Sequence, residues 1–329
     1  MGQRMVRRPY WVLTHRHRLP ARYIARAAVS KFLMRMPLCR LLTIHMDGYR
    51  LRFYPSSLSR YYWTYGRLLK GDERQAARAI FSGVVEVVAL LRRLLRPGDV
   101  FVDVGANIGA LTCQAAARVG PSGRVYAFEP HPRVCHFLRG NVRLNDFGNV
   151  AIHCSALGDA DREVSILDGV SDEARYVSEG RLDDRRADGG QASRTRIRMR
   201  CLDAVDTGDG EIALLKIDVE GYEGLVLNGA RATLARCQAV VFEASDAVLG
   251  KYGWTASMLI ETLEGLGFVV LRPQIQTGSL RPIQTGYRPP GGDDYENLVA
   301  VKSIERFARL TGWHLEATPR DDGPVIGPR

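Results

Sequence analysis

A glycine-containing turn follows one of the apolar runs of the sequence and carries a charged group. Residues 99–112 read DVFVDVGANIGALT, with Asp103 at the end of the run and Gly105 and Gly109 four positions apart. Glycine allows a positive φ angle and lets the backbone approach a ligand without a Cβ in the way. Because the residues after Gly109 are helix-like, the segment predicts a strand, a tight turn and a helix, with a ligand at the turn.

The carboxylate in this turn distinguishes two classes of cofactor. A dinucleotide-binding turn reads G-x-G-x-x-G, so that a helix N-terminus meets a pyrophosphate. Here Asp103 stands where that pattern begins with glycine, and a carboxylate would repel a diphosphate. It suits a ligand that carries a primary ammonium and a sulfonium, as S-adenosylmethionine does. Glu129, which ends the next apolar run in VYAFEP, can accept hydrogen bonds from the two ribose hydroxyls of such a ligand.

A second cluster of charges lies in ALLKIDVEGYE, residues 213–223. Alternation along a strand places Lys216, Asp218 and Glu220 on one side, and charges near a buried strand end are costly unless they pair or bind something. One interpretation is a structural network of lysine and carboxylates. The other, which we favour, places Asp218 beside a reacting methyl group. Asp218 or Glu243, from VVFEAS, is then expected to act as general base or to orient the acceptor, with Glu220 and Lys216 in support.

Metal binding is an alternative use of these carboxylates. Three carboxylates could hold Mg²⁺, which would in turn bind the hydroxyls of an acceptor. We do not favour this alternative and assign no metal ligands. The seven histidines offer no pair at the spacing of zinc ligands.

Strand-like and helix-like segments alternate through the middle of the chain. Short apolar runs separated by amphipathic helix patterns are typical of a parallel sheet covered on both faces. The runs are VFVDV, RVYAF, VAIHC, IALLKID, AVVFEA, FVVLR and NLVAV. The last two have no helix between them, so we expect them to be antiparallel. The sequence therefore predicts an α/β fold with a doubly wound, mostly parallel seven-stranded sheet that ends in an antiparallel hairpin.

These motifs resemble one known family. In order and spacing, the chain is similar to the FkbM-type methyltransferases over about residues 50–302, through FVDVGANIGALT, GRVYAFEPHP, NVRLND, LLKIDVEGYEGLVLNGA, VVFEAS and ENLVAV. The resemblance implies a class I, Rossmann-like fold and S-adenosylmethionine as methyl donor. It also implies O-methylation of a hydroxyl on a small molecule, a sugar or a lipid-linked glycan as the commonest outcome.

The resemblance also implies roles for particular residues. The turn would hold the methionine end of the cofactor and Glu129 the ribose. The end of the third strand-like run, Ser155-Ala156-Leu157, would flank the adenine. The cofactor-binding residues expected on this basis are Asp103, Val104, Gly105, Ala106, Asn107, Gly109, Glu129, Pro130, Ala156 and Asp218. The residues expected to serve catalysis are Asp218, Glu243, Glu220 and Lys216.

Composition shifts and helix signals suggest four parts of the chain. We expect a basic N-terminal arm at 1–48, partly disordered or amphipathic, and a helical extension or cap at 49–96. A methyltransferase domain at 97–304 would contain a polar insertion at 171–196, flanked by the strand-like runs EVSILD and RIRMR. A C-terminal helix and tail at 305–329 would follow.

Aromatic residues just before the core could face the acceptor. The segment SSLSRYYWTYGRLLKGDE contains Tyr61, Tyr62, Trp63 and Tyr65, whose rings could support a sugar ring or a lipid headgroup. They could equally pack the helix onto the sheet. Both interpretations stay open at this point.

The positive charge of the chain is concentrated near its N-terminus. Residues 1–70 hold 15 Lys or Arg and one acid, Asp47, a net charge of +14 against +10 for the whole chain. Such an arm could contact anionic lipid, nucleic acid or an anionic substrate, or it could be solvated, or serve as an organelle transit peptide. Residues 22–36, RYIARAAVSKFLMRM, could form a basic amphipathic helix at an anionic membrane.

Three functions are therefore compared. We favour an O-methyltransferase acting on a small-molecule, sugar or lipid-linked acceptor. An RNA methyltransferase that uses the basic arm is the alternative, but no RNA-binding module is recognisable outside the core. A cofactor-binding pseudoenzyme is disfavoured because Asp103, Glu129 and Asp218 are present. The oligomeric state is not predicted.

Composition points to a cytoplasmic protein that could lie peripherally at a membrane. No window approaches about 18 uninterrupted apolar residues, and basic residues interrupt every candidate signal sequence in the first 40 positions. The cysteines form no C-x-x-C pair, so we expect reduced thiols. They are Cys39, Cys113, Cys135, Cys154, Cys201 and Cys237.

Overall fold

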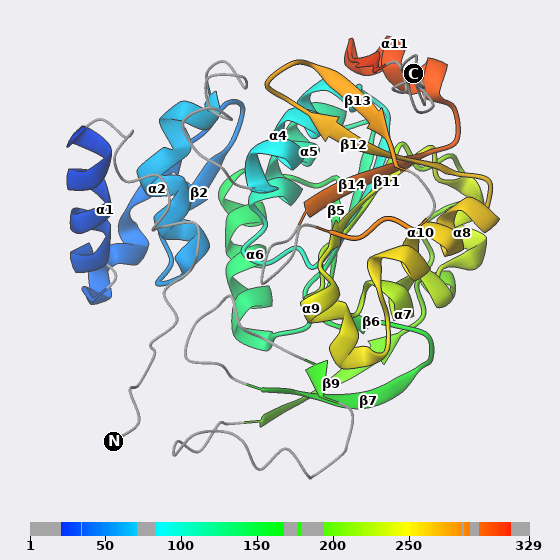
Figure 1. Ribbon diagram of the computed structural model, residues 1–329. Coiled ribbons are helices and arrows are strands. Elements are labelled where there is room, and N and C mark those ends of the chain that lie inside the picture. Colours follow the sequence, from blue (N-terminus) through cyan, green and yellow to red (C-terminus); the bar gives the residue numbers. More distant parts are fainter. Residues whose placement is uncertain are drawn as a thin grey trace, which may run out of the picture.

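The structure is a computed structural model of the chain (Figure 1). The residues that it describes are 21–33, 35–70, 83–167, 177–178, 194–283, 286–289 and 296–316.

A central sheet organises the molecule. Its strands are β3 (Val100–Val104), β4 (Arg124–Phe128), β5 (Val150–His153), β10 (Leu214–Ile217), β11 (Ala239–Ala244), β12 (Val269–Gln274), β13 (Ser279–Pro282), β14 (Glu296–Val301) and β15 (His314–Leu315). Over the described residues they lie in the order β15-β13-β12-β14-β11-β10-β3-β4-β5. The five strands from β11 to β5 are parallel, and β14 runs antiparallel to both β11 and β12. The predicted class I fold, with its late antiparallel strand, is confirmed.

Two short strands extend the sheet beyond the seven that the sequence predicts. The β13 strand pairs antiparallel with β12, and β15 pairs parallel with β13 at the edge. The segment that forms β13 does not look like a strand in the sequence, because prolines are rare in strands. In the structure Pro273 and Pro282 lie within the paired residues of β12 and β13. Proline donates no ladder hydrogen bond, and it is therefore tolerated near the edge of a sheet.

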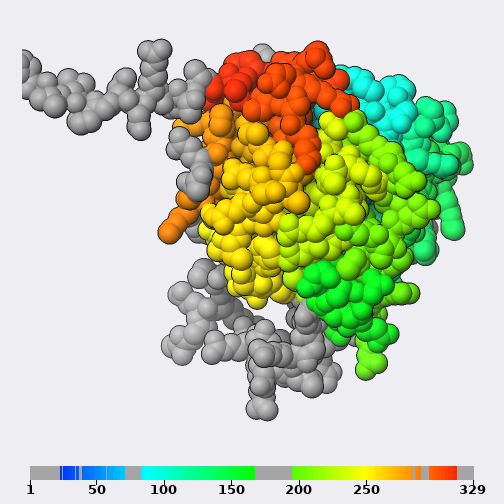
Figure 2. Space-filling view, turned by 90° about the vertical axis from the view of Figure 1, so that its right-hand side faces the viewer, coloured from blue at the N-terminus to red at the C-terminus, as the bar shows by residue number. Residues whose placement is uncertain are grey.

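Helices cover both faces of the sheet (Figure 1). One face packs against α4 (Gly83–Leu94), α5 (Ala110–Val119) and α6 (Pro132–Leu144), and the other against α7 (Glu223–Asn228), α8 (Arg231–Arg236) and α10 (Ala256–Gly265). The side chains of β3 alternate between these two faces. Phe101 packs in the core on the side of α4, α5 and α6, and Val102 and Val104 pack in the core on the side of α7, α8 and α10. Figure 2 shows α8 and α10 as a continuous lime to yellow face, with α11 (Ile304–Thr311) above it.

A smaller sheet follows β5. It contains β6 (Ala156–Leu157), β7 (Arg162–Leu167), β8 (Val177–Ser178) and β9 (Arg194–Arg200), in the order β6-β9-β7-β8. The β7 and β9 strands pair antiparallel, which confirms the extra strand pair predicted around the insertion. Of the predicted insertion at 171–196, residues 177–178 and 194–196 belong to this sheet. Its other positions lie outside the described residues.

The N-terminal part packs against the core through a hairpin and two helices. These elements are α1 (Ala21–Leu33), η2 (Pro37–Leu41), β1 (Thr43–His45), β2 (Arg50–Arg52) and α2 (Ser57–Lys70). The backbone amides of Arg50 and Arg52 donate to the side chains of Asn145 and Asn141 near the end of α6, at 2.7 Å each. The hairpin lies across the boundary predicted at residue 48, and the domain boundaries stay a prediction. Residues 1–20 of the predicted arm lie outside the described residues.

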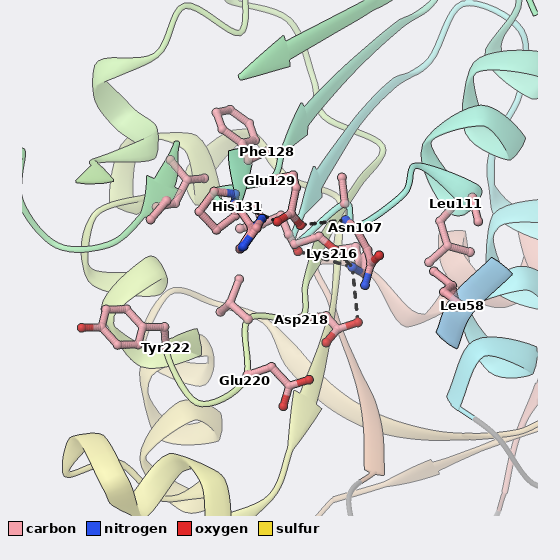
Figure 3. Close-up of a pocket in the computed structure, with 18 of the residues that line it drawn as sticks. Leu58, Asn107, Leu111, Phe128, Glu129, His131, Lys216, Asp218, Glu220 and Tyr222 are labelled. Carbon is pink, nitrogen blue, oxygen red and sulfur yellow. Dashed lines mark hydrogen bonds and ion pairs between the residues drawn. The ribbon is translucent and has the colours of Figure 1, made fainter. Parts of the chain in front are cut away.

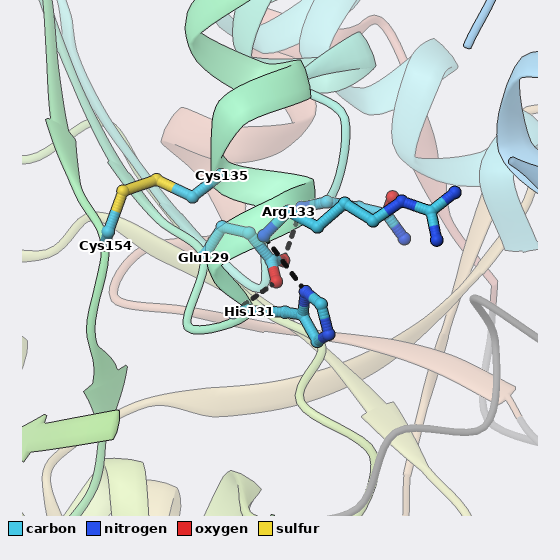
Figure 4. Close-up of a disulfide and its surroundings, with 6 residues drawn as sticks. Glu129, His131, Arg133, Cys135 and Cys154 are labelled. Carbon is cyan, nitrogen blue, oxygen red and sulfur yellow. Dashed lines mark hydrogen bonds between the residues drawn. A yellow bond between two sulfur atoms is a disulfide. The ribbon is translucent and has the colours of Figure 1, made fainter. Parts of the chain in front are cut away.

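A disulfide joins Cys135, in the first turn of α6, to Cys154, directly after β5 (Figure 4). The expectation that all the cysteines are reduced thiols is therefore wrong for this pair. The cysteines are 19 positions apart, and their sequence contains no C-x-x-C signature, so their approach depends on how α6 packs beside β5. The other four cysteines are free.

No helix among the described residues combines the length and the apolar character needed to cross a bilayer.

Candidate cofactor and acceptor site

A cavity of about 200 Å³ lies at the carboxyl ends of β3, β4 and β10 (Figure 3). Its walls come from the turn after β3, the end of β4, the start of the smaller sheet and the loop after β10, with side chains of α2 and α4 on one side. Of the residues predicted to bind the cofactor, those that line it are Val104, Gly105, Ala106, Asn107, Glu129, Pro130, Ala156 and Asp218. Lys216 and Glu220 line it too, whereas Asp103, Gly109 and Glu243 are not among its lining residues.

Two glycines shape the turn from residue 103 to residue 109, hereafter the cofactor turn. Gly105 has a φ of +80°, and a Cβ there would collide with the carbonyl oxygen of Asp218. Gly109 has a φ of +82°, and its Cβ would collide with the Leu138 side chain on α6. The amides of Gly105 and Ala106 both donate to the carbonyl of Phe128, at 3.0 and 2.9 Å. The cofactor turn therefore fits tightly between β4 and the loop after β10.

Glu129 fixes the geometry beside this turn. One carboxylate oxygen accepts the backbone N–H of Asn107 at 3.0 Å, and the other accepts that of His131 at 2.9 Å (Figures 3 and 4). His131 in turn caps α6 by accepting the amide of Arg133 on its Nδ1 at 3.2 Å. Glu129 is buried except where it meets the cavity, so its carboxylate is held in one orientation.

Lys216 lies beneath the cofactor turn and connects it to the rim of the cavity. Its ammonium donates to the carbonyl of Gly105 at 2.9 Å and lies 3.3 Å from carboxylate oxygens of both Asp103 and Asp218. Burial lowers the pKa of Lys216, but the charges of Asp218 and Asp103 outweigh it and leave that pKa above its ordinary value. The lysine is therefore a permanent cation that fixes the turn.

Asp103 supports the turn from below. Its side chain is completely buried, accepts a hydrogen bond from the Thr112 hydroxyl at 2.6 Å and pairs with Lys216. The structure thus places it away from the cavity, where the sequence led us to expect a direct contact with the cofactor. A carboxylate is required here because it neutralises a buried ammonium.

The predicted catalytic carboxylates differ in their exposure to solvent and in their place at the cavity. Asp218 has a side chain 48% exposed, and Glu220, with a φ of +56°, also lines the cavity. Glu243 is half-buried, and its desolvation, together with the charges of Asp218, Glu220 and Glu223, raises its pKa well above the ordinary value. Asp218 lines the cavity and Glu243 does not, so Asp218 is the better placed of the two to accept a proton from a ligand.

Further functional candidates emerge from packing rather than from motifs. The hydroxyls of Tyr62, on α2, and of Ser155 are buried, have no hydrogen-bond partner among the described residues and belong to residues that line the cavity. An unpartnered buried hydroxyl is costly and is a natural partner for a ligand. No motif marks Ser155, but its position at the end of the third strand-like run already placed it, with Ala156 and Leu157, beside the expected adenine.

The other aromatic residues of α2 serve packing. Tyr65 stacks on Tyr23 of α1 with ring centroids 6.2 Å apart, and Trp63 meets Phe53 edge-on at 5.5 Å. Of the two interpretations that the sequence left open, packing therefore holds for these residues, and Tyr62 combines packing with a place in the cavity wall.

Acidic residues do not form a metal centre in the part of the chain that is described: no group of three or more His, Cys, Asp or Glu there has the geometry to hold a metal ion.

Known proteins resemble this chain across the same region. The model of the methyltransferase FkbM domain matches residues 103–270. AMB antimetabolite synthetase AmbE of Pseudomonas aeruginosa is 33% identical over 209 residues, which are 54% of this chain and 10% of that protein. The 31-O-demethyl-FK506 methyltransferase FkbM of Streptomyces tacrolimicus is 32% identical over 206 residues, which are 55% of this chain and 76% of that protein.

A solved structure, the methyltransferase FkbM from Methylobacillus flagellatus, matches 74% of this chain and 59% of its own with 15% identity and a TM-score of 0.37. The chain thus spans a tenth of the length of AmbE and about three quarters of the length of the Streptomyces protein.

Proposed function

Since this chain belongs to the FkbM methyltransferase domain family, we propose that it transfers a methyl group from S-adenosylmethionine to a hydroxyl oxygen of its acceptor. Its core is an S-adenosylmethionine-dependent methyltransferase domain. The observation that supports oxygen as the methylated atom is the position of Asp218. Its carboxylate lines the same cavity as the cofactor turn and is 48% exposed, so a hydroxyl in the cavity can reach it.

The chain's own residues fit the cofactor. Glu129 lies in the cavity wall, where its carboxylate can accept a hydrogen bond from a ribose hydroxyl. The unpartnered hydroxyl of Ser155 lies in the wall where the adenine is expected, and it can bond a ring nitrogen. The backbone of Gly105 and Ala106 is open to the methionine end.

Methyl transfer to an alcohol requires alignment and removal of a proton. When bound, S-adenosylmethionine supplies an electrophilic methyl with a neutral thioether as leaving group. Asp218 accepts the hydrogen bond of the acceptor hydroxyl and takes its proton as the new bond forms. Lys216 holds Asp218 in place from 3.3 Å, and Tyr62 with Leu58 forms an apolar wall that limits the access of water.

The relatives support oxygen as the methylated atom. The name of the Streptomyces relative describes an enzyme that methylates an oxygen of a small molecule, and that relative matches the present chain over three quarters of its own length. We propose a hydroxylated acceptor here as well: a small molecule, a sugar or a lipid-linked glycan.

The test uses S-adenosylmethionine labelled with ¹³C in the methyl group. The protein is incubated with pools of hydroxylated small molecules, sugars, lipid-linked sugars and RNA, and the carbon shift of the product distinguishes methyl on oxygen from methyl on nitrogen or carbon. An O-methyl signal from one of the first three pools supports the proposal. Label on nitrogen or carbon, or in RNA alone, overturns it. So does a protein that binds the donor and transfers nothing to any pool.

Asp218→Asn tests the assigned base. Removing a general base costs about 10²–10⁴-fold in rate, whereas the affinity for S-adenosylhomocysteine should change little. Asp209→Asn, at an exposed position, is the matched control and should keep the wild-type rate.

A further inference from the structure

Exposed apolar side chains are concentrated in α1, η2 and the turn between them. Within the described residues seven large hydrophobic side chains are exposed, and four of them fall between positions 29 and 41. These four are Val29, Phe32, Met36 and Leu41, at 49%, 65%, 38% and 73% exposure. We refer to these four residues as the α1 strip. Such clustering differs from the isolated exposed side chains that are normal on a protein surface.

Other residues of α1 pack against α2. Tyr23 and Ser30 are buried, and Tyr23 stacks on Tyr65 of α2. Arg26 lies over the Trp63 ring at 5.2 Å and donates from Nε to the Trp63 carbonyl at 3.1 Å. The helix is therefore held firmly on α2, and the residues of the α1 strip remain exposed to solvent.

Positive charge surrounds the α1 strip. Lys31, Arg35 and Arg40 are exposed between its apolar members, and the first acid of the chain is Asp47. The sequence of residues 1–20 adds five arginines and no acid. A second copy docking through this same face would bring like charges together, because a two-fold interface pairs a patch with itself. An anionic surface complements the charges instead.

We propose that the α1 strip binds the surface of an anionic membrane. Phe32 and Leu41 enter the boundary between headgroups and acyl chains, and Lys31, Arg35 and Arg40 lie at the level of the anionic headgroups. This proposal is independent of the methylated atom and of the acceptor. It has one consequence for the cavity: α1 packs on α2, which supplies Leu58 and Tyr62 to the cavity wall, so that wall lies one helix layer from the lipid.

The test is cosedimentation of the full chain with lipid vesicles. We expect binding to vesicles of phosphatidylcholine mixed with phosphatidylglycerol, weaker binding at high salt because the charges are screened, and little binding to phosphatidylcholine alone. Each basic residue near an anionic surface contributes roughly fivefold in affinity. The triple variant Lys31→Glu, Arg35→Glu, Arg40→Glu should therefore lose about a hundredfold or more.

A second variant tests the apolar part. Phe32→Ser with Leu41→Ser should lower vesicle affinity at least about tenfold, because the two side chains no longer leave water. Met258→Ser with Val269→Ser changes two exposed apolar residues outside the strip, at 40% and 41%, on α10 and β12 and should bind like wild type. All variants should keep their affinity for S-adenosylhomocysteine, which shows that they are folded.

Several results would overturn the proposal. These are no binding to anionic vesicles, equal binding to both vesicle types, or wild-type binding by the two α1 strip variants. A dimer in light scattering that the Phe32→Ser, Leu41→Ser variant abolishes would assign the strip to self-association instead. A failure here leaves the methyl-transfer proposal unaffected, because vesicle binding is measured without donor or acceptor.

Discussion

Lys216 and Asp103 are register partners on neighbouring strands, and their side chains pair at 3.3 Å beneath the cofactor turn. Both side chains are almost entirely excluded from solvent. The same ammonium donates to the carbonyl of Gly105, inside the turn. The pair therefore acts as a support for the backbone that meets the cofactor, and its two charges are tolerable because each neutralises the other.

Breaking this pair should destabilise the protein strongly. Lys216→Met leaves the buried Asp103 carboxylate without its cation, which costs about 3–5 kcal/mol of unfolding free energy. The double variant with Asp103→Asn should lose less than the sum of the two single variants, because neither charge is then left alone. Urea unfolding measures both, with the exposed Lys70→Met as control. A loss below about 1 kcal/mol for Lys216→Met would contradict a structural role.

The close approach of Gly105 to the loop after β10 predicts a difference between two glycine substitutions. Gly105→Ala adds a methyl that collides with the Asp218 carbonyl, whereas Gly253→Ala adds one in open space at a similar positive φ, +76°. Gly253→Ala should cost about 1–2 kcal/mol from backbone strain alone. Gly105→Ala should cost clearly more in urea unfolding and should also weaken S-adenosylhomocysteine binding. Equal costs would show that the turn can move away from Asp218.

The fold was predictable because its signals are local. Parallel strands buried on both faces are continuous apolar runs, and the missing helix between FVVLR and NLVAV identified the antiparallel end of the sheet. Short edge strands carry little such signal, and the prolines at 273 and 282 further obscured β13 and the end of β12. The sequence therefore predicted the core of the sheet and missed its margin.

The site was predictable in position and less so in roles. The turn, Glu129 and Asp218 lie together at the cavity, as expected from the ends of their strands. A carboxylate at a strand end has the same sequence pattern whether it meets a ligand or a lysine. The lysine that pairs with Asp103 comes from a strand that neighbours β3 in the sheet but lies far along the sequence. The disulfide and the contact of Glu86 with Asn297, 211 positions apart, likewise depend on tertiary packing alone.

Glu129 should be required for cofactor affinity. Its carboxylate can accept charge-assisted hydrogen bonds from ribose hydroxyls, each worth about 1.5–3 kcal/mol, so Glu129→Ala should weaken S-adenosylhomocysteine binding by about 10–100-fold or more. Calorimetric titration measures the change, and Glu163→Ala, exposed on β7, is the control. If the folded Glu129→Ala variant bound S-adenosylhomocysteine with wild-type affinity, the ribose would have to bind at another position.

The disulfide predicts a thiol count. Alkylation of the unfolded, unreduced protein should label four cysteines, and prior reduction should raise the number to six. The crosslink spans 19 positions, so its loss should lower stability by about 3 kcal/mol on the chain-entropy model. Cys135→Ser with Cys154→Ser should reproduce that loss, and Cys201→Ser provides a control at a free cysteine. Six labelled thiols without reduction would contradict the link.

The carboxyl of Glu86 should make stability fall as pH rises. Burial, partly offset by the hydrogen bond from Asn297 at 3.0 Å, raises the pKa of Glu86 from 4.5 to about 7. Between these values the folded protein holds a proton that the unfolded chain has released, so the contribution of Glu86 declines with pH by about 3 kcal/mol in total.

Glu86→Gln removes this dependence, because the amide does not titrate and can still accept the hydrogen bond of Asn297. Relative to wild type, the variant should therefore gain up to about 3 kcal/mol as pH rises from 4.5 to above 7. Urea unfolding at several pH values gives this difference and isolates Glu86 from Glu223, whose pKa burial also raises to about 7. Glu264→Gln measures the same substitution at an exposed position. A constant difference across this range would show that Glu86 does not release its proton there.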